Sequence, residues 1–270
     1  MTALVLLGGN DMFNAKLIPK TDSFIIGYNI EDGSIISEKL YLYVDKRNIH
    51  DNTVGIANNE FIRNLLLSCE NLRYLDSETE SDQNSNKYDF QVESQKCYYQ
   101  AKKYLANNTS LFDEKTIDKI ESISWINSIF TTIGLRFSAE NIIDLDVYYR
   151  RNPFAIPKLE ELSFLPKSSF RECLCWADFL FVESVAVRLL AIDFQKTRTL
   201  LKIYFEAGDP NIIQRIVSFQ QDTINYAAVN QLYKYSSLNN LQFGAIALVM
   251  DLKTDYIRYN YYFKKGLPIC

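Results

Sequence analysis

The sequence predicts an α+β fold in which a ten-stranded antiparallel β-barrel, built from five repeated strand-strand-helix units, is surrounded by helices. Three observations support this prediction: five segments with paired strand-forming runs around turn residues, helical segments between them, and polar residues that alternate with aliphatic ones. Strand formers that bound turn residues are the signature of a hairpin, and closure removes the exposed edges of a large sheet. We expect the 270 residues to form one domain, 1–270.

The predicted hairpins recur along the chain. The first, FIIGYNIEDGSIISEKLYLYV, has two strand-forming runs around EDGS. The five predicted hairpins occupy residues 24–44, 71–94, 133–150, 187–208 and 243–263. Helices are expected between them, at about 56–70, 95–128, 158–183 and 209–236. In these segments NEFIRNLLL and IIQRIVSF carry apolar residues at i, i+3 and i+4, which is the pattern of an amphipathic helix.

Composition restricts the class of protein. With 47% hydrophobic and 23% charged residues and a net charge of -4, the chain is expected to be soluble and to bind neither nucleic acid nor anionic membrane. No apolar run approaches the roughly 20 residues that span a bilayer, and we expect a cytoplasmic protein. The 5 cysteines are widely spread and are expected to be reduced thiols. His50 is the only histidine and is expected in a solvated loop.

Alternation along the strands predicts which side chains face the barrel interior. Leu201, Ile203 and Phe205 alternate with Lys202 and Tyr204, so the aliphatic residues would face the helices and the polar ones the interior. On other strands the residues expected inside include Lys39, Tyr41, Tyr43, Asp144, Asp146, Tyr148, Arg258, Asn260 and Tyr262. A half-exposed sheet would give the same alternation in any one hairpin. Its recurrence favours a polar interior wide enough for a ligand.

Cations and phenol rings in one interior suit a particular chemistry. Lysine and arginine hold a diphosphate by charge-assisted hydrogen bonds, and tyrosine rings stabilise a developing carbocation. These two functions together favour the ionisation of an allylic diphosphate inside the barrel. A metal-cluster motif of the DDxxD type is absent from the sequence, which disfavours the helical prenyl synthases.

Two segments with this pattern, AIDFQKTRTLLKIYF and KTDYIRYNYYF, resemble the soluble aromatic prenyltransferases of the ABBA fold, a ten-stranded barrel ringed by helices. The resemblance implies diphosphate contacts and a shield of rings around the allylic cation. The implied diphosphate ligands are Lys39, Lys196, Lys202 and Arg258. The implied shield consists of Tyr43, Tyr148, Tyr204 and Tyr262. YDFQVES is similar to a family strand whose aspartate helps to hold magnesium, which nominates Asp89, although no cofactor is implied as obligatory.

The chain departs from the family pattern in two places. Asp144 stands where the family usually has a lysine that binds the diphosphate. The first hairpin, with Lys39 and Tyr43, resembles the last hairpin of the family. The resemblance therefore implies either a permuted hairpin order or a match between different copies of the repeat.

The leading hypothesis is an aromatic prenyltransferase that moves an allylic group from its diphosphate to an indole, a phenol or a peptide side chain. Asp144 or Asp146 would then remove the proton from the acceptor. The expected partners are the prenyl diphosphate and a small aromatic or peptide acceptor, and the protein is expected to be a monomer. The alternative is a non-catalytic ligand- or partner-binding repeat barrel, in which the lysines and arginines form ion pairs or face solvent. A barrel of this family that has lost activity is a third possibility.

Overall fold

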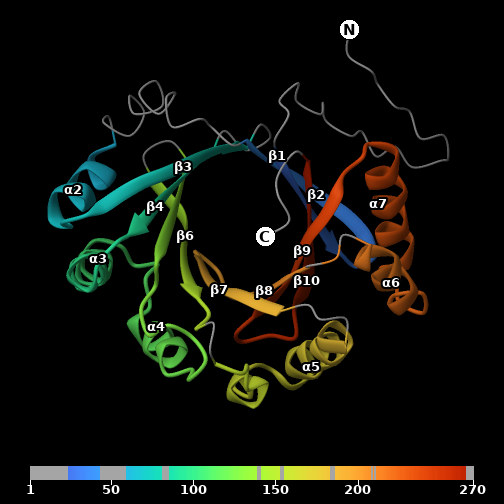
Figure 1. The fold of residues 1–270 in the computed structure, drawn as a ribbon. Coiled ribbons are helices and arrows are strands. Elements are labelled where there is room, and N and C mark those ends of the chain that lie inside the picture. The colour runs from blue at the N-terminus through green and yellow to red at the C-terminus, as the bar shows by residue number, and fades with distance from the viewer. Residues whose placement is uncertain are drawn as a thin grey trace, which may run out of the picture.

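The computed structural model describes residues 24–42, 59–80, 85–138, 141–152, 155–182, 186–207, 209 and 211–265. Tyr43 and His50 lie outside these ranges. Within them, ten strands form a single antiparallel sheet, which curls strongly, and the helices lie on its outer side (Figure 1).

The strands form five consecutive hairpins. The first two are β1 (Phe24–Glu31) with β2 (Ser34–Leu42), and β3 (Leu72–Glu80) with β4 (Ser85–Val92). The third is β5 (Thr132–Ser138) with β6 (Asn141–Arg150). The last two are β7 (Ala186–Gln195) with β8 (Thr199–Glu206), and β9 (Gln242–Asp251) with β10 (Ile257–Lys265). All five hairpins lie where the sequence predicts them.

Helices occupy the segments between the hairpins, as predicted. They are α2 (Glu60–Ser68), α3 (Gln95–Asn108), α4 (Glu114–Glu121), a short 3-10 helix (Leu159–Leu162), α5 (Lys167–Val182), α6 (Ile212–Phe219) and α7 (Tyr226–Leu238). α2 and α3 begin with capping side chains, since Asn59 and Ser94 accept hydrogen bonds from backbone N–H groups of the first turn. Across the described ranges, none of the helices combines the length and the apolar character needed to cross a bilayer.

The order of strands in the sheet is β2-β1-β10-β9-β8-β7-β6-β5-β4-β3. The first hairpin of the chain therefore lies beyond the last one, because β1 pairs with β10 along Phe24 to Ile30. The two ends of the sheet, β2 and β3, approach each other to within 8 Å between Cα atoms, but no ladder of hydrogen bonds joins them in the described ranges. The mixed α+β class and the single antiparallel sheet are confirmed. The predicted closure into a barrel is not.

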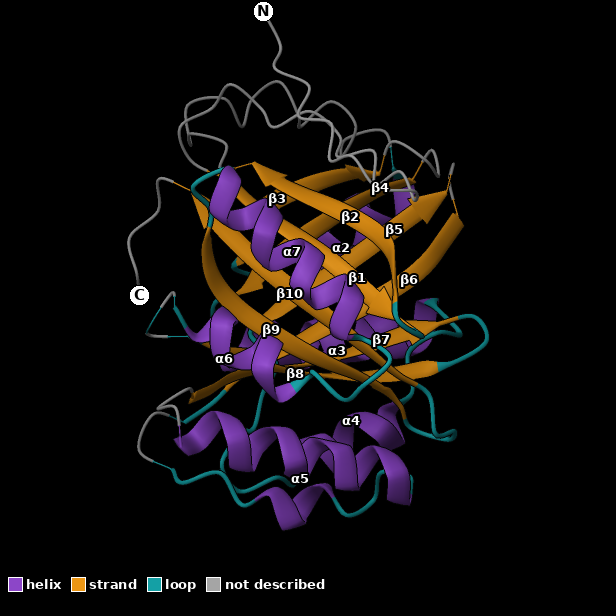
Figure 2. Cartoon of the chain, turned by 90° about the vertical axis from the view of Figure 1, so that its right-hand side faces the viewer, coloured by secondary structure: helices purple, strands orange, loops and turns teal. Residues whose placement is uncertain are grey.

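The main core lies between the convex face of the sheet and the helices. Leu201, Ile203 and Phe205 on β8 are fully buried and belong to one apolar cluster with helix residues such as Ile216 and Leu232. α6 and α7 lie across the outside of the strands, and α4 and α5 lie outside the part of the sheet that contains β7 and β8 (Figure 1, Figure 2). Each fully buried aliphatic side chain contributes about 1.5–3 kcal/mol relative to an exposed one. This face therefore holds the sheet and helices together.

The turn of the first hairpin is fixed against the last repeat. Asp32 and Gly33 both have positive φ, 46° and 77°, which a two-residue hairpin turn requires. The N–H of Gly33 donates to Oδ1 of Asn225 over 3.0 Å, at the start of α7. A Cβ atom at Gly33 would lie 2.6 Å from the backbone oxygen of Ile224. The glycine thus permits both the turn and its close contact with the segment before α7.

Candidate functional site

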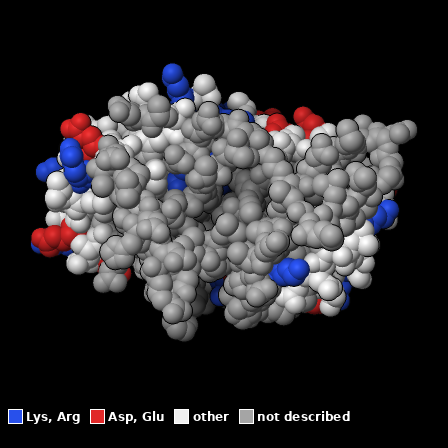
Figure 3. All heavy atoms as spheres, turned by 90° about the horizontal axis from the view of Figure 1, so that it is seen from above, with Lys and Arg blue, Asp and Glu red and all other residues white. Residues whose placement is uncertain are grey.

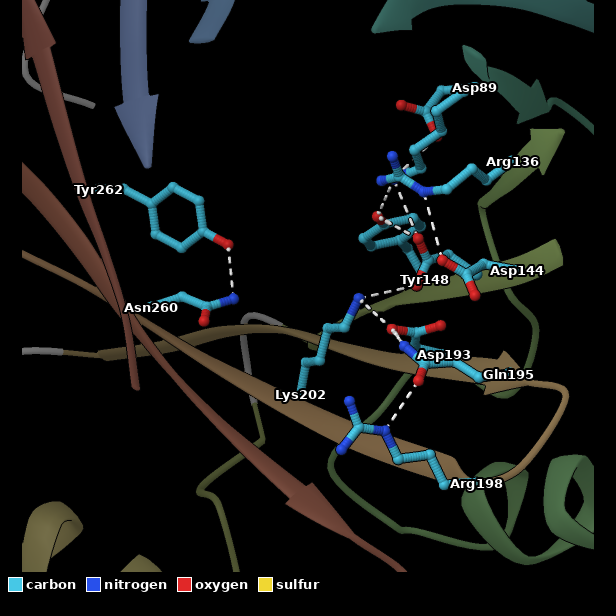
Figure 4. A network of polar contacts seen from close by, with 12 residues as sticks. Asp89, Arg136, Asp144, Tyr148, Asp193, Gln195, Arg198, Lys202, Asn260 and Tyr262 are labelled. Carbon is cyan, nitrogen blue, oxygen red and sulfur yellow. Dashed lines mark hydrogen bonds and ion pairs between the residues drawn. The ribbon is translucent and has the colours of Figure 1, made fainter. Parts of the chain in front are cut away.

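Polar side chains gather on the concave face of the sheet, at positions that alternate with core residues. On β6, Asp144, Asp146 and Tyr148 alternate with the fully buried Leu145 and Val147. Neighbouring strands add Lys87 and Asp89 (β4), Arg136 (β5), Asp193 (β7) and Lys202 (β8). Figure 4 shows the labelled members of this group converging from several strands. We call these eight polar residues the interior network.

Lys202 is held by two carboxylates. Its Nζ lies 2.9 Å from Oδ1 of Asp146 and 3.0 Å from Oδ2 of Asp193. Burial alone would lower the pKa of Lys202, but the charges of these two carboxylates outweigh it and raise the pKa above its usual value. Lys202 is therefore a fully charged residue whose charge is already compensated.

Lys87 is the second lysine of the network. Its Nζ lies 3.0 Å from Oδ2 of Asp146 and 3.5 Å from Oδ1 of Asp89, and it donates to the Tyr148 hydroxyl over 2.8 Å. That hydroxyl donates in turn to Asp146. Burial alone would raise the pKa of Asp146, but Lys202 and Lys87 outweigh it and hold the pKa below its usual range. Asp146 therefore stays ionised and is a poor proton acceptor.

Gly134 on β5 makes room for this arrangement. It is paired in register with Asp89 on one side and Asp146 on the other. A Cβ atom there would lie 2.5 Å from Oδ1 of Asp89 and 2.7 Å from Cε of Lys87. Real Cβ contacts of that length do not occur, so glycine lets the lysine cross the strand to reach Asp146.

Asp144 differs from Asp146 because it has one cationic partner. Its Oδ2 lies 3.2 Å from Nε of Arg136, and its side chain is 26% exposed, against 6% for Asp146. Burial and the charge of Asp193 raise the pKa of Asp144 to about 6, against the opposing effect of Arg136. A carboxylate with this pKa exchanges a proton near neutral pH, which suits a general base.

A chain of side-chain contacts links the network to the first strand. Gln195 donates to Oδ2 of Asp193 over 3.0 Å, and Nε of Arg198 donates to Gln195 over 2.8 Å. The Arg198 guanidinium lies 4.6 Å from the centre of the Tyr256 ring. The Tyr256 hydroxyl then donates to Glu31 of β1 over 2.9 Å. These contacts join the β7–β8 turn to β10 and β1.

The part of the concave face on β8 and β10 carries rings and amides. The rings of Tyr204 and Tyr262 lie 5.9 Å apart between centroids. Nδ2 of Asn260 donates to the Tyr262 hydroxyl over a long 3.4 Å (Figure 4). Ala247 on the intervening β9 pairs with both Tyr204 and Asn260, so only a small side chain separates them. Arg258 is half-buried, and its Nε is buried without a hydrogen-bond partner.

The structure brings some of the predicted site residues together and separates others. Asp89, Asp144, Asp146, Tyr148 and Lys202 all belong to the interior network. Arg258, Tyr204 and Tyr262 lie on β8 and β10 of the same face. Lys196 is exposed in the turn after β7. Lys39 lies on β2 and its side chain is not described, and Tyr43 lies outside the described residues.

The sequence interpretation assigned no role to Lys87, Arg136 or Asp193. Each lies close to a residue that the sequence did identify. Lys87 is two residues from Asp89 on the same strand, and Asp193 pairs with Asp146 on the neighbouring strand. The same alternation of period 2 that identified Lys202 would have found them. The alternation is clearest on strands whose other face is aliphatic, and the polar residues Lys87, Arg136 and Asp193 lie on β4, β5 and β7.

The residues around Asp89 do not suit a magnesium ion. The ammonium of Lys87 lies 3.5 Å from Oδ1 of Asp89, where a bound divalent cation would be repelled. No cluster of three or more residues of metal-binding type is found in the part of the chain that the structure describes. We derive no step through a metal.

The outer surface carries charges of both signs. On the face seen in Figure 3, the described acidic and basic side chains are interspersed around the periphery. The net charge of the chain is -4.

No model of a protein family matches the chain, and a search of curated proteins finds no match. The resemblance to the aromatic prenyltransferases therefore depends on the residues of this chain alone.

Proposed function

We propose that the chain is an aromatic prenyltransferase, which transfers an allylic group from its diphosphate to an electron-rich aromatic acceptor inside a closed ten-stranded barrel. The single observation that carries this proposal is the inverted sheet, with its aliphatic core outside and its charges and phenols inside. A barrel whose purpose was stability alone would be filled with aliphatic side chains. The pairing of β1 with β10 makes the first and last hairpins neighbours, as a barrel of consecutive hairpins requires.

The ion pairs of the interior network limit where a diphosphate can bind. Lys202 and Lys87 are compensated by carboxylates, and a diphosphate would have to displace those partners and leave them buried without a counter-charge. Breaking a buried ion pair in this way costs about 3–5 kcal/mol. We therefore assign the diphosphate to the side formed by β10, β1 and β2, which carries Arg258 and Lys39. Lys196 is exposed in the turn after β7, and we assign it to the outer phosphate of the diphosphate.

The reaction needs one bond to break and one to form. The carbon–oxygen bond of the allylic diphosphate breaks, and its electron pair leaves with the diphosphate. The allylic cation lies beside Tyr204 and Tyr262, whose rings are in contact and stabilise positive charge. A ring carbon of the acceptor forms the new bond and then loses its proton to Asp144, the carboxylate with a pKa of about 6.

Turnover tests this proposal directly. The full chain is incubated with dimethylallyl or geranyl diphosphate and a panel of indoles, phenols and aromatic peptides, with and without magnesium, and products are measured by mass spectrometry. We expect prenylated product and a loss of at least about tenfold in kcat/KM in Arg258→Gln, because a charge-assisted contact is removed. Arg171→Gln, on the exposed side of α5, is the matched control. Absence of product with every pair of substrates would eliminate the proposal.

A non-catalytic ligand-binding barrel is the second candidate. One observation favours it: both lysines of the interior network are in ion pairs with carboxylates, as expected for a structural network. Inorganic pyrophosphate separates the two candidates, since a ligand that binds only the native state must raise the melting temperature. A rise that Arg258→Gln abolishes supports the enzyme. No rise, together with stabilisation by an uncharged ligand, supports the binding barrel.

We also propose that the protein acts as a monomer in the cytoplasm. The cysteines Cys69, Cys97, Cys173 and Cys175 are all free thiols, which agrees with a reducing compartment. Gel filtration of the full chain against size standards tests the oligomeric state.

A further inference from the structure

We propose that the interior network binds a ligand with a cationic nitrogen, an ammonium or a guanidinium, between Asp144 and Asp193. Under the proposed function, on which this identification depends, the ligand is the aromatic acceptor. The acceptor would then be an aromatic amine or a peptide with a basic group near its ring, not a neutral phenol or indole.

The charge balance of the network is the first argument. It holds four carboxylates, Asp89, Asp144, Asp146 and Asp193, against the three cations Lys87, Arg136 and Lys202. The two lysines each contact two carboxylates, while Arg136 contacts Asp144 through Nε. Counted over these seven described residues alone, one negative charge is left over in a largely buried site, where uncompensated charge is costly. A ligand that carries one positive charge would complete the network.

Asp193 is an independent second argument. Its side chain is 6% exposed, and its Oδ2 contacts both Lys202 and Gln195. Its Oδ1 is buried and has no hydrogen-bond partner. A buried acceptor of this kind costs about 1–3 kcal/mol while it is unsatisfied. It therefore indicates a donor that the described residues do not provide.

The position of Asp144 connects the two arguments. Asp144 and Asp193 lie on the adjacent strands β6 and β7, offset by two residues because Asp193 pairs with Asp146, and Figure 4 shows Asp193 next to Asp144. Asp144 is the most exposed carboxylate of the network, so a cation from the interior meets it first. Because the charge of Asp193 raises the pKa of Asp144, the pair behaves as a site that lacks a counter-charge. A bound cation would supply that counter-charge.

The charged groups around the pair belong to four strands and the β7–β8 turn. Around Asp144 and Asp193 lie Lys87, Arg136, Asp146, Lys202 and, through Gln195, Arg198. Arg198 donates to the amide oxygen of Gln195 and lies over the Tyr256 ring. It therefore does not replace the missing cation.

A pair of probes that differ in one charge tests the inference. The probes are indole-3-ethylamine and indole-3-ethanol, which share a ring and a chain length, and their dissociation constants are measured by titration calorimetry at pH 7.5. We expect the amine to bind at least about tenfold more tightly than the alcohol. This preference should disappear in Asp193→Asn and in Asp144→Asn. It should persist in Asp178→Asn, which removes the same charge from the exposed side of α5.

The outcomes separate this inference from the proposed function. The cationic site is overturned if both probes bind with equal affinity, or if the preference survives in both Asp193→Asn and Asp144→Asn. Prenyl transfer is tested separately by the turnover assay. A preference for the amine without any prenylated product supports the site and removes the enzyme. Circular dichroism of each variant ensures that lost binding is not lost folding, and Asp144→Asn keeps the test open if Asp193→Asn does not fold.

Discussion

The two faces of the sheet bury their side chains to similar degrees but for opposite reasons. Ile203 on the convex face is fully buried among aliphatic residues of the sheet and helices. Lys202, its neighbour on the concave face, is 9% exposed and is surrounded by Asp146 and Asp193. Adjacent residues of one strand thus lie in an apolar core and in an ionic network.

This difference teaches that burial alone does not identify the stabilising core. The convex face gains free energy in proportion to the apolar area it removes from water. The concave face gains little net free energy from its ion pairs, because desolvation offsets most of the attraction. Such a network is expected where it serves a binding site. Because only the concave face depends on charged groups, substitutions on the two faces should differ in how their effect on stability changes with pH.

The largest expected effect comes from Lys202→Met. Removing the ammonium leaves Asp146 and Asp193 buried without it, and the free energy of unfolding at pH 7 should fall by about 3–5 kcal/mol. Lys202 helps to hold the pKa of Asp146 below its usual value, so the contribution of that pair is present above the unfolded pKa and is lost as the pH falls. The deficit of the variant should therefore shrink toward acid pH, as measured by urea denaturation.

Lys103→Met, on the exposed side of α3, is the control for this variant and should change stability by less than about 0.5 kcal/mol. A deficit for Lys202→Met that is no larger than the control would show that the network does not hold its charges as the distances indicate.

Ile203→Ala breaks the convex face instead. The lost methyl and methylene groups leave a cavity between the sheet and the helices, and the expected loss is about 3 kcal/mol. Ile203 lies in an apolar cluster, so the loss should be the same at pH 3.5, below the unfolded aspartate pKa of about 3.9, and at pH 7. Urea denaturation at both values gives the comparison with Lys202→Met. A strong dependence on pH would contradict the separation of the two faces.

Gly134→Ala tests the packing inside the network. The added methyl group would lie 2.5 Å from Asp89 and 2.7 Å from Lys87, so both side chains must move, at an expected cost of about 1–3 kcal/mol. Gly244→Ala is the matched control, since a Cβ there meets its nearest atom at 3.6 Å. Gly244 also has a negative φ, as do most strand residues, and its replacement should be neutral or slightly stabilising. Thermal denaturation of the two variants should place them apart, and equal melting temperatures would show that Lys87 does not cross β5 tightly.

The sequence was sufficient to predict the strands, because period 2 and turn residues are local signals. All five hairpins were found, including β3 with β4, whose strands carry many polar residues. The place of the first hairpin was only implied by resemblance, since pairing between β1 and β10 joins residues more than 200 positions apart. No local pattern encodes such a contact.

The candidate site was predicted in composition but not in connectivity. Lys202 and Asp146 were both identified as interior residues, yet the sequence does not state that they would bind each other. The pairing depends on the register of β6, β7 and β8, which cross-strand neighbours set. Lys196 shows the reverse case: its charge fitted the motif, but it follows the last residue of β7 and is exposed.

Asp144→Asn gives the smallest expected effect and the sharpest distinction between the two carboxylates of β6. The pKa of Asp144 is raised to about 6 in the folded protein, whereas an unfolded aspartate has a pKa of about 3.9. A raised carboxyl pKa favours folding below the unfolded value, and this contribution is lost as the pH rises through 6. Asparagine does not titrate, so Asp144→Asn should gain about 1 kcal/mol relative to the wild type between pH 5 and pH 7.5. Asp178→Asn is the matched control for removal of a carboxylate in the same urea titrations. Asp146→Asn should be less stable than the wild type by a constant amount between pH 5 and pH 7.5, because the pKa of Asp146 is lowered and its contribution is complete above the unfolded value of about 3.9. If the free energies of unfolding of Asp144→Asn and Asp146→Asn changed with pH in the same way, the two carboxylates would not have the different roles of base and structural anion.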